Sequence, residues 1–231
     1  MRTKEYWVDQ LGLSWALALK DTLKSEYMTK LDTFLSLQRV FGKVYPHEKE
    51  LFKYFKLCPR ETLKVVIIVK EYGVDISAFN FPFDDSYIDS IHNGCIRKIS
   101  ECVHKDYYQS EKKLYFHIDH DFDYLATQGV LVLPLSLTSK VGSLEGHSKQ
   151  WSKFVGAVLN EIISYSPGTV FMLWGEEAKK YEQVLGPTQH VVSWESPINA
   201  FKENRSWECP NFKQVDEILT KLNGKESKIQ W

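Results

Sequence analysis

Short runs of almost wholly apolar residues, rich in β-branched side chains, constrain the fold of this 231-residue chain more than any other feature. A strand this apolar is buried on both faces, which is typical of parallel sheets. Segments with helical spacing of apolar residues separate the runs, and this alternation predicts a parallel sheet with helices on both faces. The predicted strands are 63–69, 129–134, 169–174 and a weaker 190–194, with Pro134 ending the second.

The spacing of apolar residues also predicts the helices between these strands. They are expected at 14–23, 27–35, 48–55, 88–103, 124–127, 148–165, 176–185 and 211–222. The length favours one α/β domain over residues 1–231. Ligands of parallel sheets bind beyond the carboxyl ends of the strands, so the segments that follow the predicted strands are where chemistry is expected.

Composition excludes several classes of protein. The formal net charge of -1, from 29 basic and 30 acidic residues, excludes a protein that coats nucleic acid by bulk charge, although a local basic face remains possible. The four cysteines form no C-x-x-C pair, which argues against a cysteine zinc site and favours reduced thiols in a cytoplasmic protein. No apolar stretch reaches 18 residues and no basic start precedes an apolar run, so we expect no membrane partner and no signal peptide.

One segment is dense in residue types that bind metals. It runs from His117 to Asp123 and contains two histidines and three aspartates. The spacing His-x-x-His with interleaved Asp matches no known ligand set, and no second cluster completes it. We therefore expect a solvated loop there, with no metal and no cofactor.

The segments that follow the predicted strands resemble the family 1 uracil-DNA glycosylases. The sequence 125–133, L-A-T-Q-G-V-L-V-L, continues to Leu137-Thr138 and then to His147, Trp151 and Phe154. It resembles the family's W-A-x-Q-G-V-L-L-L-N-x-x-L-T-V followed by S-H…W…F. Residues 64–68 resemble the strand before the family's G-Q-D-P-Y-H loop, and residues 171–175 resemble its F-L-L-W-G-S motif. Residues 196–200 resemble H-P-S-P-L-S-A, and residues 228–231 resemble the final P-I-D-W.

The order and spacing of these segments hold from about residue 15 to residue 231. The resemblance implies a three-layer αβα fold around a mainly parallel four-stranded sheet. It also implies a DNA N-glycosylase, a hydrolase that flips a base out of DNA and cleaves its N-glycosidic bond. The motif positions that carry this chemistry in the family are altered in this chain, and each is considered in turn.

The family places an aspartate just after its first sheet strand, and the corresponding residue is Glu71, with Asp75 as the second candidate. Cleavage of a pyrimidine glycosidic bond builds positive charge on the sugar, and a buried carboxylate stabilises that charge and orients the attacking water. Glu71 has one more methylene than aspartate, which gives it the reach for this role. The alternative is that Glu71 is a solvated residue of a loop that begins a helix.

The base pocket differs in two places on the same shortened loop. The family tyrosine that excludes thymine has its slot at Gly73, or is deleted, which implies a pocket open to pyrimidines with large C5 substituents. Alternatively, Gly73 serves a tight turn and Tyr72 fills the space. Phe79 matches the phenylalanine that stacks on the flipped base, although a core phenylalanine remains an alternative.

Two further pocket positions have lost the polar side chains that contact uracil. Pro134 takes the slot of the asparagine that hydrogen-bonds the Watson–Crick edge, and proline offers no side-chain donor or acceptor. A site without those hydrogen bonds is not specific for uracil by the family's method. The family histidine is replaced by Trp194, or by Glu195 one register away. Trp194 either lines a larger pocket and offers its N–H, or packs in the core.

The positions that grip DNA are mixed. Ile198 matches the leucine that wedges into the duplex, and Ser86 matches a phosphate-binding serine. Further residues in matching loops are candidates for DNA contacts, although solvated surface cations are the simpler interpretation of each basic residue alone; they are Lys140, Ser196, Lys202 and Arg205. Asp84, Asp85 and Glu176 would repel phosphate if they faced it.

Taken with the resemblance, these differences predict a monomeric DNA glycosylase with altered base choice. The expected substrate is a bulky C5-substituted pyrimidine, such as hydroxymethylated or glucosylated cytosine, and the product is an abasic site. Such bases occur chiefly in phage genomes, which suggests a role in anti-phage defence. The alternative is a degenerate glycosylase fold that has lost its chemistry and acts as a DNA- or protein-binding scaffold.

Overall fold

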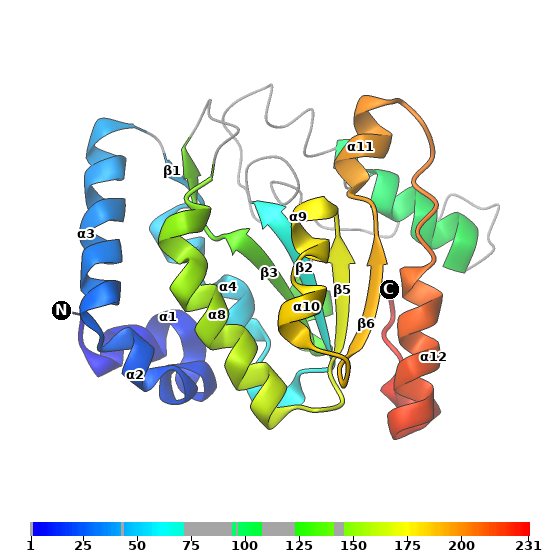
Figure 1. Ribbon diagram of the computed structural model, residues 1–231, viewed down its shortest axis with the longest axis horizontal. Helices are drawn as coiled ribbons and strands as arrows, with labels where there is room; N and C mark the ends of the chain where they lie inside the picture. Colours follow the sequence, from blue (N-terminus) through cyan, green and yellow to red (C-terminus); the bar gives the residue numbers. More distant parts are fainter. Residues whose placement is uncertain (1, 43, 72–93, 96, 108–122, 141–145) are drawn as a thin grey trace.

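A computed structural model describes residues 2–42, 44–71, 94–95, 97–107, 123–140 and 146–231. Its centre is a four-stranded sheet in the order β3-β2-β5-β6, in which every neighbouring pair is parallel. The strands are β2 (Val65–Glu71), β3 (Val130–Ser136), β5 (Val170–Trp174) and β6 (His190–Trp194). All four point toward the upper edge of the molecule in Figure 1. The expected parallel α/β sheet is therefore confirmed.

Most of the sheet is removed from water, although the side chains of β6 are only partly buried. Every residue of β3 and β5 is buried, as expected for strands with helices on both faces. The chain enters β3 through Gly129, whose backbone has φ +95. A Cβ at Gly129 would stand 2.2 Å from the carbonyl oxygen of Thr62, so only glycine permits this approach. The Gly129 carbonyl then accepts from the backbone of Lys64 and Val65, which sets β3 beside β2.

Pro134 does not end its strand, contrary to the sequence expectation. It lies inside β3 opposite Val69, and the strand continues to Ser136. The reason is that, among the residues described, β3 is an edge strand with β2 as its single neighbour, so a residue without an N–H costs no ladder hydrogen bond on the open side.

Helices cover both faces of this sheet, which gives the expected three layers. Figure 1 shows α8, α9 and α10 in front of the sheet, while α4 and α7 pack on β3 and α12 packs on β5 and β6. The helices are α1 (Lys4–Ala18), α2 (Lys20–Leu23), α3 (Glu26–Phe41), η1 (Glu48–Glu50), α4 (Lys53–Leu57), η2 (Arg60–Thr62), the π-helical η3 (Val103–Tyr107), α7 (Asp123–Thr127), α8 (Ser148–Tyr165), α9 (Glu176–Lys179), α10 (Glu182–Leu185), α11 (Pro197–Lys202), α12 (Asn211–Asn223) and η4 (Lys225–Ser227).

Three expected helices are each broken into two. The segment 14–23 spans the end of α1 and all of α2, and the segment 48–55 forms η1 and α4. The segment 176–185 forms α9 and α10 with a turn at Tyr181, whose N–H bonds the Ala178 carbonyl. The apolar spacing continues across all three breaks, so periodicity alone does not reveal them. None of the helices in the described residues is long and apolar enough to cross a membrane.

A second, two-stranded sheet was not expected from the sequence. β1 (Val44–Tyr45) pairs antiparallel with β4 (Ser139–Lys140). Strands of two residues are too short to show a side-chain alternation, so no pattern marks them. This pair ties the end of α3 to the segment that follows β3 at the carboxyl edge of the main sheet.

Candidate functional site

The carboxyl edge of the main sheet gathers three of the sequence-predicted site residues. Glu71 is the last residue of β2 and pairs with Ser136 of β3, two residues beyond Pro134. Trp194 is the last residue of β6, two strands away from β2. Glu71 and Trp194 therefore end strands, and Pro134 lies two residues before the end of β3, at the edge where ligands of parallel sheets bind. Four predicted residues lie outside the described part of the chain: Gly73, Asp75, Phe79 and Ser86.

The polar groups that follow Pro134 are satisfied within the protein. Ser136 is fully buried, and its hydroxyl donates to the Thr138 carbonyl at 2.8 Å. The Thr138 hydroxyl accepts from Trp151 Nε1 at 2.8 Å and lies 2.9 Å from His147 Nδ1. This network fixes the turn between β3 and α8, so His147 has a structural position there. No side chain among these residues supplies the hydrogen bonds that the family asparagine makes.

Trp194 shares a sheet face with Trp174, its partner in the β5–β6 ladder, because paired residues of parallel strands point to the same side. On that face Trp174 packs edge-on against Trp207 and donates its Nε1 to Asn211. The ring of Trp194 is half-buried against the core. Its Nε1 is shielded from solvent and has no hydrogen-bond partner in the part of the chain described here, which leaves one donor uncompensated.

Glu195 and Arg205 form a two-pronged ion pair next to Trp194. Arg205 Nη1 and Nη2 donate to the two carboxylate oxygens of Glu195 at 2.7 and 2.5 Å, and Nε donates to Glu203 at 2.6 Å. The hydrogen bonds to Glu195, and then those to Glu203, raise the pKa of Arg205 above its usual value. The arginine is therefore already paired with carboxylates, and a phosphate contact would require exchange of one of them.

The residues of α11 have mixed exposure. Ser196 caps the helix, with its hydroxyl accepting from the Ile198 N–H at 3.4 Å, and it is buried. Ile198 is only 6% exposed, so its side chain packs in the core and does not project as a wedge in this arrangement. A wedge role would require α11 to shift. Lys202 is exposed on α11, and Lys140 ends β4.

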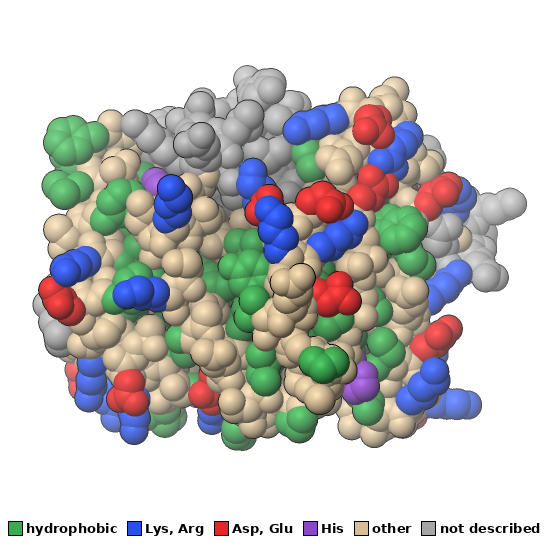
Figure 2. Space-filling model, in the orientation of Figure 1, with side chains coloured by type: hydrophobic (Ala, Val, Ile, Leu, Met, Phe, Trp, Pro, Cys, Tyr) green, Lys and Arg blue, Asp and Glu red, His purple; other side chains and the backbone are tan. Residues whose placement is uncertain are grey.

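Of the carboxylates expected near the DNA path, Asp84 and Asp85 lie outside the described residues, and Glu176 is balanced by a neighbouring cation. Glu176 and Glu177 are exposed in the first turn of α9, and each pairs with the lysine three residues later, at 2.9 and 2.6 Å. Figure 2 shows acidic and basic side chains side by side over α9 and α11. Repulsion of phosphate by Glu176 is weakened accordingly, since Lys179 offsets its charge.

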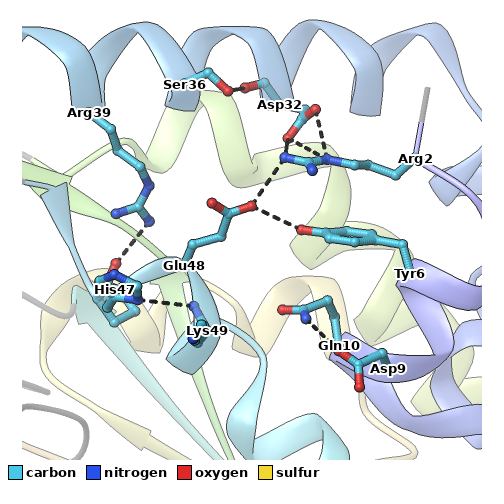
Figure 3. A network of polar contacts seen from close by, with 11 residues as sticks. Arg2, Tyr6, Asp9, Gln10, Asp32, Ser36, Arg39, His47, Glu48 and Lys49 are labelled. Carbon is cyan, nitrogen blue, oxygen red and sulfur yellow. Dashed lines mark hydrogen bonds and ion pairs between the residues drawn. The ribbon is translucent and has the colours of Figure 1, made fainter.

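A small cavity lies away from this edge, between α1, α3 and α8. Its polar wall is the network in Figure 3, in which Arg2 donates to Asp32 and Glu48, and the Tyr6 hydroxyl donates to Glu48. Its volume of about 40 Å³ is enough for a few waters but too small for a pyrimidine base. Trp7 Nε1, buried without a partner, lines the same wall, and a water would satisfy it. This cavity is not the base pocket.

Contacts between distant motifs were not evident from the sequence. Gln128 of the A-T-Q-G segment exchanges two hydrogen bonds with the backbone of Gln230 near the end of the chain, and Trp231 Nε1 donates to Asp216. These pairs are 102 and 15 residues apart, so only the folded chain brings them together. The described residues hold no group of three His, Cys, Asp or Glu side chains suited to a metal. Most of the segment from His117 to Asp123 lies outside those residues.

Comparison with known proteins gives one consistent result. The chain is 27% identical over 232 residues to the uracil-DNA glycosylase of Psychromonas ingrahamii, covering 95% of this chain and 100% of that protein. It is 27% identical over 223 residues to the uracil-DNA glycosylase of Oceanobacillus iheyensis, covering 94% and 93%. No family model matches the chain.

Solved structures with the same fold carry the same family name. The crystal structure of mimivirus uracil-DNA glycosylase superposes with a TM-score of 0.76 at 16% identity, covering 100% of this chain and 89% of the other. The wild-type enzyme of Nitratifractor salsuginis superposes with a TM-score of 0.54 at 16% identity, covering 98% and 96%. At this identity the structures support the fold, while the curated relatives extend the likeness to nearly the whole sequence.

Proposed function

Because the chain belongs to the uracil-DNA glycosylase superfamily, we propose that it is a DNA N-glycosylase whose preferred base is a bulky C5-substituted pyrimidine. In this proposal the enzyme flips hydroxymethylated or glucosylated cytosine out of DNA and hydrolyses its N-glycosidic bond, which leaves an abasic site. Glu71 is the carboxylate that faces the developing charge on the sugar.

The observation that carries the altered base choice is Pro134. It lies within the buried strand β3, opposite Val69, and offers no side-chain hydrogen bond to a base. The alignment around it is anchored on both sides. Gly129 makes the tight turn into the strand, and Thr138 and Trp151 bond to each other beyond it. A shift of register that would return an asparagine to the slot is therefore disfavoured.

Loss of polar contacts predicts loss of uracil discrimination, because sites built to hydrogen-bond a substrate reject analogues far more strongly than apolar walls do. The half-buried indole of Trp194, at the same sheet edge, supplies apolar area in place of the family histidine. Both changes favour a base held by stacking and shape over one read by its Watson–Crick edge.

A panel of duplexes tests this proposal. Each duplex carries one uracil, 5-hydroxymethyluracil, 5-hydroxymethylcytosine or glucosylated 5-hydroxymethylcytosine, and cleavage at abasic sites is scored after alkali. We expect a C5-modified base to be excised faster than uracil, and Glu71→Gln to lose that activity. Excision of uracil alone would contradict the base choice. Binding of DNA without excision of any base would instead support the scaffold alternative.

The proposed biological role is anti-phage defence, since the expected bases are found chiefly in phage DNA. A plaque assay separates this role from repair. Cells that produce the protein should restrict phages with glucosylated cytosine and not phages with ordinary cytosine, and cells that produce Glu71→Gln should restrict neither. Equal plating of both phages on both strains would contradict the role while leaving the glycosylase activity to be judged by the duplex panel.

A further inference from the structure

We propose that Glu195 and Arg205 are positioning residues that hold the segment from Trp194 to Ile198 in place for excision. This inference rests on the proposed function, because that segment is the one expected to meet the flipped base and the DNA. The pair joins a residue two positions before α11 to a residue three positions after it. Both prongs of the Arg205 fork are used, at 2.7 and 2.5 Å, so the geometry is bidentate.

The helix between these two residues needs external support. α11 has six residues, far fewer than an isolated helix requires to be stable in water. Its first turn is held by the Ser196 cap and by the buried Ile198. Beyond its other end, the Arg205 side chain reaches back to the Glu195 carboxylate at the start of the segment, and Trp207 Nε1 reaches back to the Glu195 carbonyl.

The return of the chain toward Glu195 has a specific cause. Asn204 has φ 50, the one non-glycine residue with a positive φ in the described part of the chain. Asparagine tolerates this left-handed conformation better than most residues, and here it closes the helix. The turn sends Arg205 back, with its N–H bonded to the Ala200 carbonyl at 2.9 Å. The fork then meets the carboxylate of Glu195.

The start of the segment is fastened independently of the ion pair. The Gly175 N–H donates to the Trp194 carbonyl at 2.9 Å, and Trp207 Nε1 donates to the Glu195 carbonyl at 3.0 Å. These bonds hold the backbone to the end of β5 and to the chain after α11. The buried side chains of Pro197, Ile198 and Ala200 seat one face of α11 in the core, and the side-chain pair adds the link between the two ends of the segment. Breaking the pair should therefore displace α11 without unfolding the edge of the sheet.

The related family motif suggests why an ion pair stands here. The motif H-P-S-P has proline where this chain has Glu195, and proline restricts the backbone on its own. Glu195 lacks that restriction, and its link to Arg205 restores it. The side chains of Glu195 and Arg205 are 29% and 40% exposed, so the pair contributes little to global stability. Misplacement of a catalytic segment by about 1 Å costs on the order of 100-fold in rate.

The experiment compares Glu195→Gln, Arg205→Lys and the exchanged double variant Glu195→Arg/Arg205→Glu with the wild-type protein. The matched control is the other partly buried arginine–glutamate pair, Arg60 with Glu161, changed to Arg60→Lys and Glu161→Gln at the opposite end of the sheet. Three quantities are measured for each protein. They are single-turnover excision of the base identified by the duplex panel, affinity for a duplex with a non-cleavable abasic analogue, and the midpoint of thermal unfolding.

We expect each single change at Glu195 or Arg205 to slow excision by at least ~10-fold, with affinity changed by less than ~3-fold and the unfolding midpoint by less than ~3 °C. The exchanged pair should recover most of the lost rate, and the control changes should leave excision unaltered. If the single variants keep the wild-type rate, or if the exchange recovers none of it, the positioning role is overturned. If wild-type protein excises no base in the panel, the result contradicts the proposed function, on which this inference rests.

Discussion

The ring of Phe201 in α11 lies where a side chain on Gly94 would have to stand. A Cβ at Gly94 would be 2.0 Å from Phe201 Cε2 and 2.2 Å from Cδ2. Gly94 and Cys95 are helical, as are residues 97–102. The absence of a side chain at Gly94 therefore lets α11 pack directly against that helix.

This contact makes Gly94→Ala a sensitive probe of how α11 is seated. The added methyl must push the Phe201 ring aside, and overpacking of this kind costs about 1–3 kcal/mol in the free energy of unfolding. In a Phe201→Ala background the clash is gone, so Gly94→Ala should cost nothing or stabilise the helix slightly. Urea unfolding of the four proteins measures this coupling. Additive effects of the two changes would mean that the ring and Gly94 do not touch.

The turn between β3 and α8 gives a second prediction. Thr138→Val keeps the shape of the side chain but leaves Trp151 Nε1 buried without an acceptor, so we expect a loss of about 1–3 kcal/mol in the free energy of unfolding. Thr138→Ser keeps the hydroxyl and should cost clearly less. Chemical denaturation measures both. Equal losses in the two variants would show that the methyl group, and not the hydrogen bond, is what matters at Thr138.

The main sheet was predictable because its signal is strong and local. The run Val65–Val69 and the residues of β5 are apolar at every position. Strands on the surface of a soluble protein do not have that composition, so these runs indicate buried strands. The pair β1–β4 was not predictable, since two residues per strand carry no periodicity. Pro134 was taken as a strand end because the sequence does not reveal that β3 lies at the edge of the sheet.

The position of three candidate residues at the sheet edge was predictable for a similar reason. Glu71, Pro134 and Trp194 each follow or end a run that the sequence marks as a strand. The sequence marks Glu195 and Arg205 as candidates but does not reveal that they pair. The pairing depends on the left-handed turn at Asn204. A single asparagine among polar residues does not predict that conformation. Burial of Ile198 was missed because its slot in the motif suggested exposure.

The buried thiol of Cys58 predicts a loss of stability at high pH. Burial raises the pKa of Cys58 to about 12, from 9.0. In the unfolded chain the thiol loses its proton near pH 9, while the folded protein holds it until about pH 12. The unfolded state is then favoured as pH rises between these values, by about 1.4 kcal/mol per pH unit for this group. Below pH 9 the thiol is protonated in both states and has no effect.

Urea unfolding at pH 8, 9, 10 and 11 measures this dependence. Cys58→Ala should be less stable than wild-type protein at pH 8, because the change leaves a small cavity, but its stability should fall less steeply above pH 9. Parallel curves for the two proteins would assign the alkaline loss to other groups, such as Tyr6, whose pKa burial also raises to about 12.

Pro134 gives a direct test of base choice. Pro134→Asn restores the side-chain amide that the related motif places at this position, and it also adds a backbone N–H to β3. We expect uracil excision to rise in the variant relative to excision of the C5-modified base, by ~10-fold or more in the ratio of the two rates. Pro134→Ala, which adds the N–H without the amide, is the control. An equal gain in both variants would assign the effect to the backbone.

Glu71 should be the residue whose loss lowers the excision rate most. Its backbone is held at the end of β2 by pairing with Ser136, which places it at the carboxyl edge of the sheet. A carboxylate that faces the oxocarbenium charge in a dry site contributes about 3–4 kcal/mol to the barrier, or roughly 10²–10³ in rate. Glu71→Gln keeps the shape and removes the charge, so the single-turnover rate should fall by that factor while DNA affinity is retained.

Asp75→Asn is the matched control, because Asp75 is the next carboxylate along the chain. If Asp75→Asn abolishes excision and Glu71→Gln does not, the alignment of the loop after β2 is displaced by the length of its deletion, and Asp75 takes the role. If both variants keep the wild-type rate on the preferred base, the glycosidic bond is broken without help from either carboxylate. In that case the charge that develops on the sugar must be met by the DNA phosphates themselves, and the rate should then fall on substrates with neutral methylphosphonate links beside the base.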